Sequence, residues 1–174
     1  MMGDEVEQTL FRTDPSTFGT AEEYRSYLLE QYKIFITSAE KISDRRQTAN
    51  SFYVTLNTVI ITLVSYLHRG QGENLDNYFL IPLAGVVVSY TWLRLLRSYK
   101  DLNTAKFSVI HMIENKLPLN MYDAEWEALG RGKDTKKYRS FTSLEFTIPG
   151  VFIGLHTVAL VMSFPWSLIG CLFH

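Results

Sequence analysis

The stretch SDRRQTANSFYVTLNTVIITLVSYL, residues 43–67, begins with charged side chains and continues into a run that has none. The uncharged part, 47–67, is long enough to cross a bilayer, because a hydrocarbon core about 30 Å thick needs roughly 20 helical residues. Two further uncharged windows follow at 77–93 and, histidine apart, at 146–174. The sequence therefore predicts three membrane segments.

The predicted fold is an all-α integral membrane protein. An antiparallel transmembrane hairpin is extended by cytoplasmic helices, and a third transmembrane segment follows at the C-terminal end. The first half comprises a disordered N-terminus (1–19), a cytoplasmic amphipathic helix (20–48), transmembrane helix 1 (49–67) and an external loop (68–77). The second half comprises transmembrane helix 2 (78–97), a cytoplasmic helical region (98–145), and transmembrane helix 3 with its tail (146–174).

Local signals support several of these boundaries. Thr20 and Glu23 have the spacing of a capping box, which predicts a helix start. No proline or glycine separates that helix from the first membrane segment, so the two are expected to form one rod. In YDAEWEALG, residues 122–130, Asp123 is the expected N-cap and Gly130 the expected stop.

Arginines flank the first two membrane segments on one side. Arg45 and Arg46 precede the first segment, and Arg94 and Arg97 follow the second. Basic residues concentrate on the cytoplasmic side of membrane proteins. The N-terminus and residues 98–145 are therefore expected in the cytoplasm. We interpret the four arginines as membrane-edge residues that contact anionic lipid head groups.

A stripe of hydroxyl side chains runs along the first membrane segment, with an asparagine beside it. Its residues are Ser51, Thr55, Asn57, Thr58, Thr62 and Ser65. Two uses fit this pattern. Small polar residues allow close packing against another helix. In a ring of subunits the same residues would line a water-filled path, and an uncharged path would discriminate weakly between ions.

Small residues also recur four apart in the other two segments. Gly85 and Ser89 form such a pair in the second, and Gly150 and Gly154 form a GxxxG pair in the third. Both pairs permit close approach of helix backbones. We interpret them as helix-packing sites that favour an oligomer.

Composition and motifs argue against several function classes. A net charge of −1 does not fit a nucleic-acid binder, which would carry a basic stripe. The chain has none of the common hydrolase, nucleotide-binding or zinc-protease motifs, so no enzyme activity, catalytic residue, cofactor or metal is expected. His111 and Glu114 share a helix face, and the favoured interpretation of that pair is a solvated surface.

Four stretches together resemble the RipA-like family of small octameric bacterial membrane proteins. They are SDRRQTANSFYVTLNT, LRLLRSYKDLNTAKFSVIHMIENKLP, EWEALG and SLEFTIPGVF, and the resemblance covers about residues 25–160. The layout is also similar to SLATT-type membrane effectors, which form pores in bacterial defence, although the third hydrophobic segment departs from their two-helix pattern. The resemblance implies a self-assembling octamer in the bacterial inner membrane.

Two functions are therefore expected. The first is a membrane scaffold or stress and host-adaptation factor, whose cytoplasmic helical ring binds an unidentified cytoplasmic protein. The second is a pore-forming or membrane-disrupting effector with the hydroxyl stripe facing the pore.

Overall fold

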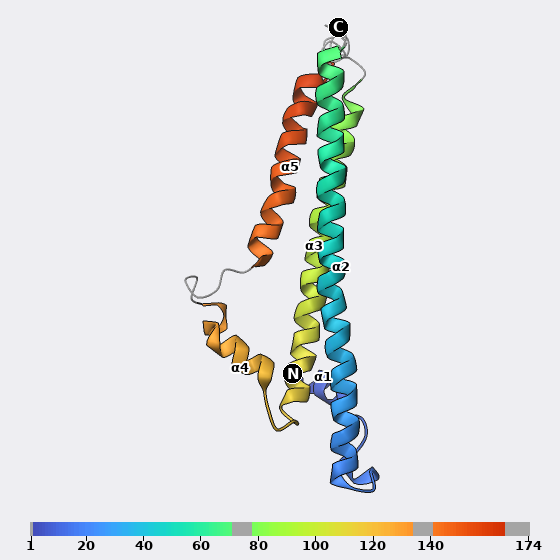
Figure 1. Ribbon diagram of the computed structural model, residues 1–174, viewed down its shortest axis with the longest axis vertical. Helices are drawn as coiled ribbons and strands as arrows, with labels where there is room; N and C mark the ends of the chain where they lie inside the picture. The colour runs from blue at the N-terminus through green and yellow to red at the C-terminus, as the bar shows by residue number, and fades with distance from the viewer. Residues whose placement is uncertain (1, 71–77, 134–140, 166–174) are drawn as a thin grey trace. The chain divides into compact units, whose positions relative to one another are not determined.

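The computed structural model describes residues 2–70, 78–133 and 141–165, and every regular element in these ranges is helical (Figure 1). The α-helices are α1 (Met2–Leu10), α2 (Ala21–Gly70), α3 (Leu80–Glu114), α4 (Met121–Ala128) and α5 (Phe141–Ser163). Two short 3-10 helices are η1 (Pro15–Thr17) and η2 (Gly130–Gly132). Three helices, α2, α3 and α5, are long and apolar enough to cross a membrane. The predicted all-helical membrane fold is confirmed.

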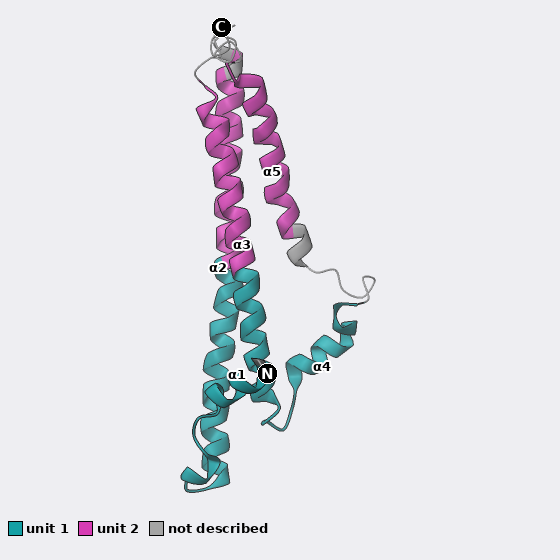
Figure 2. Cartoon of the chain, turned by 180° about the vertical axis from the view of Figure 1, so that it is seen from behind, with its two compact units in different colours: residues 1–45, 99–140 teal, residues 46–98, 141–174 magenta. Residues whose placement is uncertain are grey.

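The chain forms two compact units (Figure 2). Unit 1 comprises Met1–Arg45 and Tyr99–Ser140, and unit 2 comprises Arg46–Ser98 and Phe141–His174. Helices α2 and α3 each contribute one part to both units. The uncharged windows all belong to unit 2, whereas unit 1 holds the amphipathic segments.

The core of unit 1 lies between α2 and α3. Its buried members are Leu28, Tyr32, Ala39, Ile110 and Ile113. The α2 residues recur at helical spacing, which places them on one stripe of that helix. This unit is therefore held together by the apolar face of an amphipathic helix, as the pattern predicted.

The structure differs from the sequence prediction at residues 1–19, where it has α1 and η1 in place of disorder. Phe11 packs against the core of unit 1 and lies beneath the Lys116 ammonium group, 5.4 Å from it. Lys116 also pairs with Glu7 at 3.2 Å. Asp14 caps η1 by accepting a hydrogen bond from the Ser16 backbone N–H, which lowers the pKa of the Asp14 carboxyl. The turn-forming residues that suggested disorder therefore form a capped turn.

Helix α2 begins at the predicted capping box. The Glu23 backbone N–H donates to Thr20 Oγ1 at 3.1 Å, and the Glu23 carboxylate accepts from the Gly19 N–H at 3.2 Å. The predicted helices at 20–48 and 49–67 form one continuous helix, as expected from the absence of a breaker. The helix extends through Gly70 into the predicted external loop, and 71–77 lie outside the described residues.

Helix α3 likewise joins the predicted transmembrane helix 2 to the start of the region at 98–145. The N-cap of α4 is Asn120, not Asp123 as predicted. Asp123 instead lies 3.4 Å from the Arg131 guanidinium group. Gly130 has the left-handed φ of 68° that ends a helix, as its predicted role requires. In the third segment, the predicted tail at 166–174 lies outside the described residues.

Candidate functional site

A buried polar cluster joins the three helices of unit 2 within their apolar segments. Asn57 of α2, Ser89 of α3 and His156 of α5 are each 0% exposed. Asn57 Oδ1 accepts from Ser89 Oγ at 2.6 Å and lies 3.0 Å from His156 Nε2. Asn57 Nδ2 donates to the Tyr53 carbonyl at 2.8 Å, which assigns its amide orientation. His156 Nε2 must therefore carry the proton, because the oxygen that it faces is an acceptor.

Gly85 lets the imidazole ring of His156 reach this cluster. A Cβ atom added at Gly85 would lie only 2.3 Å from His156 Nδ1. Any side chain at this position would overlap the ring, so the glycine is required by close packing. The predicted small pair Gly85 and Ser89 is thus used inside the protomer, where Ser89 Oγ also lies 2.8 Å from the Gly85 carbonyl oxygen.

A second polar cluster lies at the ends of the apolar segments that are nearest to the arginines. Trp92 Nε1 donates to Asn50 Oδ1 at 2.9 Å, and Asn50 Nδ2 donates to Glu145 Oε1 at 3.1 Å. The Arg46 guanidinium lies 3.4 Å from the same carboxylate oxygen. Tyr53 stacks on the buried Trp92 ring at 5.7 Å. Four side chains from α2, α3 and α5 thus provide hydrogen-bond and ion-pair partners for one another at one level of the bundle.

The hydroxyl stripe of α2 does not join these clusters. Its five serines and threonines are exposed in the protomer, and four of these side chains donate to carbonyl oxygens of their own helix. Asn57, which the sequence analysis grouped with these residues, lies instead in the buried polar cluster with Ser89 and His156. The reason is geometric: Asn57 is offset by about 100° from Thr58 around the helix, enough to reach a different face.

Gly150 and Gly154 of α5 are likewise exposed. A Cβ atom added at either glycine would meet nothing within 4 Å. Among the described residues, this pair therefore has no packing role inside the protomer. Of the four membrane-edge arginines, Arg45, Arg94 and Arg97 are exposed, while Arg46 is half-buried against Glu145. Contact of the exposed arginines with lipid head groups stays a prediction.

Replacing Asn57 by leucine is expected to destabilise unit 2 by about 1–3 kcal/mol, because it leaves the buried His156 Nε2–H without an acceptor. Thermal unfolding in detergent, followed by tryptophan fluorescence, to which the buried Trp92 contributes, measures the loss. Val59→Leu, at an exposed position of the same helix, is the control. Equal melting temperatures for the two variants would contradict this role of Asn57.

Unit 1 contains a third polar cluster, centred on Glu114. This carboxylate is 0% exposed, so the predicted solvated surface at His111 and Glu114 is wrong. Glu114 Oε1 accepts from the Tyr32 hydroxyl at 2.7 Å and from the Tyr122 backbone N–H at 3.1 Å. Its other oxygen lies 3.8 Å from His111 Nδ1. One carboxylate thus connects α2 and α3 and caps the first turn of α4.

Burial changes the acid–base chemistry of the two tyrosines beside Glu114. Burial raises the pKa of Tyr32 above its ordinary value of 10.0, and the hydrogen bond and negative charge of Glu114 raise it further. The pKa of Tyr122 is also raised, first by burial and then by nearby carboxylates. Both hydroxyls therefore stay protonated and uncharged at neutral pH.

Sequence reasoning grouped Asn57 with the hydroxyl stripe, as a pore-lining or packing residue, and interpreted Gly85 and Ser89 as packing residues. It did not identify His156 as the partner that these three residues share. It also missed the burial of Glu114 and the contact between Arg46 and Glu145. The available signal was the presence of polar side chains inside or beside apolar helices, since such groups normally face protein. Within the described residues, no group of three or more potential ligands is placed to hold a metal ion.

Comparison with known proteins gives a family but no close relative. No curated protein and no solved structure matches the chain. Residues 29–165 match the pattern of the octameric membrane protein family (8xMP). This match includes most of α2, all of α3 and α4, and α5 through its last turn. The chain therefore belongs to the octameric membrane protein family.

Proposed function

We propose that the chain is a homo-oligomeric scaffold of the bacterial inner membrane that acts in stress or host adaptation. In this proposal unit 2 anchors each copy in the bilayer. The unit 1 regions of all copies together form a cytoplasmic helical ring. The ring binds a cytoplasmic protein. No catalysis is proposed for the chain itself.

The observation that carries the proposal is the apolar surface of unit 1. Large apolar side chains are exposed on its helices and its loop, and among them Ile34 is 70% exposed and Leu119 is 67% exposed. Larger groups of exposed apolar side chains in a water-soluble region mark interaction surfaces. Packing between copies and binding of a further protein are the two ways to cover such side chains.

The cytoplasmic orientation rests on the arginines. Arg45, Arg46, Arg94 and Arg97 all lie near the ends of unit 2 from which α2 and α3 continue into unit 1. The positive-inside preference then assigns unit 1 to the cytoplasm. A cysteine at the exposed Ser108, in a chain with Cys171 replaced by serine, should react with an impermeant maleimide only after lysis. Labelling of intact spheroplasts would contradict this orientation.

An alternative function is a pore, favoured by the exposed hydroxyl stripe of α2. A ring of subunits that turned this face inward would surround a polar, uncharged path. Four of the five stripe hydroxyls are already bonded to their own helix, so they tolerate lipid or protein as well as water. The stripe alone therefore does not favour water over a neighbouring helix.

Ion leak from liposomes separates the two functions. We expect liposomes that carry the reconstituted wild-type oligomer to stay tight to small ions, because a scaffold needs no open path. Leak from the wild type that Thr58→Leu abolishes would establish the pore instead. Thr91→Leu, at an exposed position of α3 away from the stripe, is the matched control. Failure of a deletion strain to grow under membrane stress would then support the adaptation role.

A further inference from the structure

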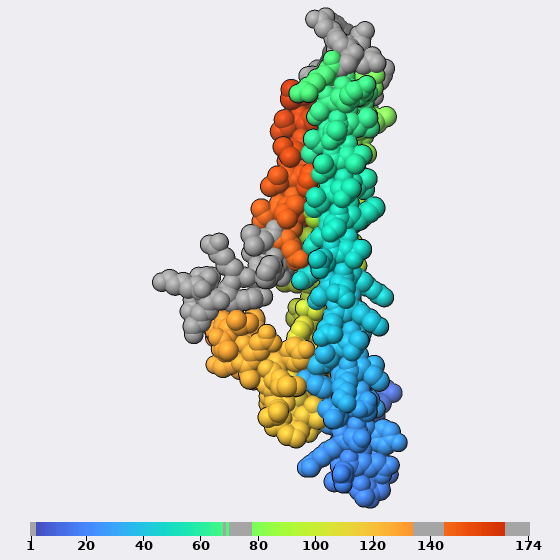
Figure 3. Space-filling model, in the orientation of Figure 1, coloured from blue at the N-terminus to red at the C-terminus, as the bar shows by residue number. Residues whose placement is uncertain are grey.

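Two exposed faces of unit 2 consist of small side chains. The first, the α2 seam, is formed by Ser51, Thr55 and Thr58, and the second, the α5 seam, by Gly150, Gly154 and Thr157. All six residues are exposed in the protomer. Figure 3 shows the outward surface of α2 with that of α5 beside it. Both seams are shallow, because neither has a side chain larger than threonine.

The two seams lie at similar heights in the bundle. Helices α2 and α5 run in the same direction, since Asn50 meets Glu145 and Asn57, further along, meets His156. The contact between Asn57 and His156 spans 99 residues. The same difference in number relates Ser51 to Gly150, Thr55 to Gly154 and Thr58 to Thr157. Close to Asn57 and His156, Thr58 and Thr157 are therefore counterparts at about the same level. The contact between Asn50 and Glu145 spans 95 residues, so the match shifts by about one helical turn toward Ser51 and Gly150.

The two seams also point to opposite sides of the protomer. At about 100° per residue, each seam is centred about 120° around its helix from the inward residue, Asn57 or His156. The rotation has the same sense in both helices, because the helices are parallel and the positions correspond. Since Asn57 and His156 face each other, equal rotations turn the two seams in opposite directions.

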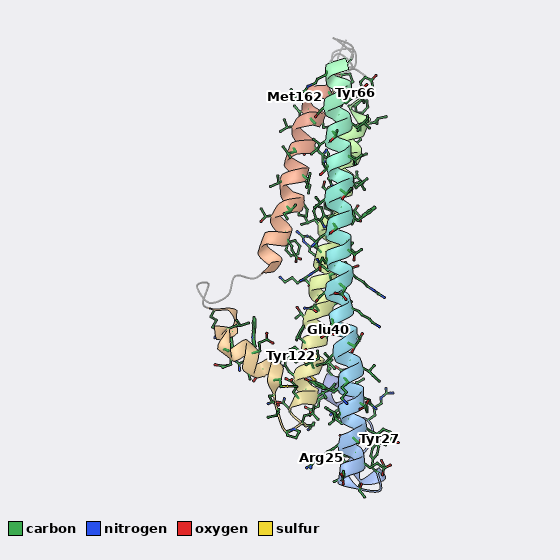
Figure 4. The ribbon with its side chains drawn as sticks, in the orientation of Figure 1. Arg25, Tyr27, Glu40, Tyr66, Tyr122 and Met162 are labelled. Carbon is green, nitrogen blue, oxygen red and sulfur yellow. The ribbon has the colours of Figure 1, made fainter. Side chains whose placement is uncertain are left out.

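Large apolar side chains occupy the neighbouring faces of both helices. On α2 they are Phe52, Val59, Leu63 and Tyr66, and on α5 they are Val151, Leu155, Val158 and Met162, all exposed. Figure 4 labels Tyr66 and Met162, which are 73% and 69% exposed. Such side chains suit contact with lipid, whereas small residues allow helix backbones to approach closely. Each helix therefore has a face of large apolar side chains beside a face of small side chains that is suited to a neighbouring helix.

A second copy of this chain is the occupant that fits both seams. Members of the family assemble as octamers, so some membrane face of each protomer must contact a neighbour. All copies enter the bilayer in one orientation, and a ring built from them needs two different, complementary faces on each copy. Faces at similar height that point to opposite sides meet this requirement.

We propose that the α2 seam of one copy packs against the α5 seam of the next copy, at a similar height, and that repetition of this contact closes the ring. Thr55 then lies against Gly154 of the neighbour, and Thr58 lies against its Thr157. The glycines let the two helices approach closely, and the threonine hydroxyls stay bonded to their own helix. The three residues of the hydroxyl stripe that form the α2 seam are then buried between subunits and do not line a path for water.

Disulfide cross-linking between two tagged versions of the chain tests this contact. Cys171 is the single cysteine, so replacing it by serine provides a background without thiols. One version carries Thr58→Cys and the other carries Thr157→Cys, and both are expressed together and oxidised in native membranes. We expect a dimer that carries both tags. Thr55→Cys with Gly154→Cys should give the same product. A single chain with Thr58→Cys and Thr157→Cys should give a ladder beyond the dimer.

Two controls make the result specific. Thr58→Cys paired with Gly150→Cys places the thiols about 10 Å apart in height, so this pair should lose most of the product. Thr58→Cys paired with Leu155→Cys, on the large apolar face of α5, should also give little cross-linked dimer. Dimers from Thr58→Cys alone would mean that α2 packs on α2 and would overturn the head-to-tail contact.

The inference rests on the homo-oligomer of the proposed function, and mass measurement in nanodiscs separates the two. The mass of a monomer would contradict both the scaffold proposal and this contact. An octamer that gives no product with either matched pair would overturn the contact alone. As a second readout, Gly154→Leu should dissociate the octamer into folded protomers, because a Cβ atom added at this exposed position meets nothing within 4 Å inside the protomer. An intact octamer of Gly154→Leu would also contradict the seam.

Discussion

Replacing Gly85 by alanine is expected to give one of the largest losses of stability available from a single methyl group in this protein. The added Cβ would lie 2.3 Å from Nδ1 and 2.4 Å from Cε1 of the fully buried His156 ring. Overpacking of a tight core costs about 1–3 kcal/mol, and more where the neighbour cannot move. His156 has little freedom to move, because its Nε2–H is held by Asn57 on the opposite side.

The measurement is thermal unfolding in detergent with tryptophan fluorescence as the signal. Gly150→Ala is the matched control, since its added methyl group meets nothing within 4 Å in the protomer. The double variant Gly85→Ala with His156→Ala separates steric overlap from loss of a glycine in general. The alanine methyl group should lower the melting temperature much less when the imidazole of His156 is absent. An equal cost in both backgrounds would show that the overlap with His156 is not the cause.

The second large effect is expected in unit 1, where replacing Glu114 by leucine should loosen α4 from the unit. The change leaves two donors without their acceptor, the Tyr32 hydroxyl and the Tyr122 backbone N–H. Each unsatisfied buried donor costs about 1–3 kcal/mol. Hydrogen exchange of residues 121–128, followed by mass spectrometry, should show faster exchange. The exposed Glu125→Leu in the same region is the control, and unchanged exchange in Glu114→Leu would contradict the role of this carboxylate.

The same cluster gives unit 1 a predictable dependence on alkaline pH. The pKa of Tyr32 is raised on folding, so its contribution to stability is fully present below its ordinary pKa of 10.0. This contribution is lost as the pH rises above that value, because the unfolded tyrosine ionises first. The raised pKa of Tyr122 acts in the same direction. Tyr32→Phe should therefore flatten the fall in stability above pH 10.0, and an unchanged slope would show that Tyr32 does not contribute.

The candidate membrane segments and the positions of most helices could be predicted from the amino-acid sequence. Uncharged windows and capping signals are local properties, so they can be recognised without knowing what a helix contacts. For the same reason the continuity of α2 from Ala21 to Gly70 was predictable from the absence of a breaker. Residues 1–19 were the exception, because their order depends on Phe11 packing against a core formed by distant segments.

Which polar residues meet depends on tertiary packing and could not be predicted from the sequence. Asn57 and Thr58 are neighbours in sequence, yet one is buried against Ser89 and His156 and the other is exposed. The periodicity of a helix tells which residues share a face, but not which face turns toward a neighbour. That choice depends on the rotation and height of three helices relative to one another. It is set by long-range contacts such as His156 against Gly85 and Glu114 against Tyr32, which no local pattern in this sequence encodes.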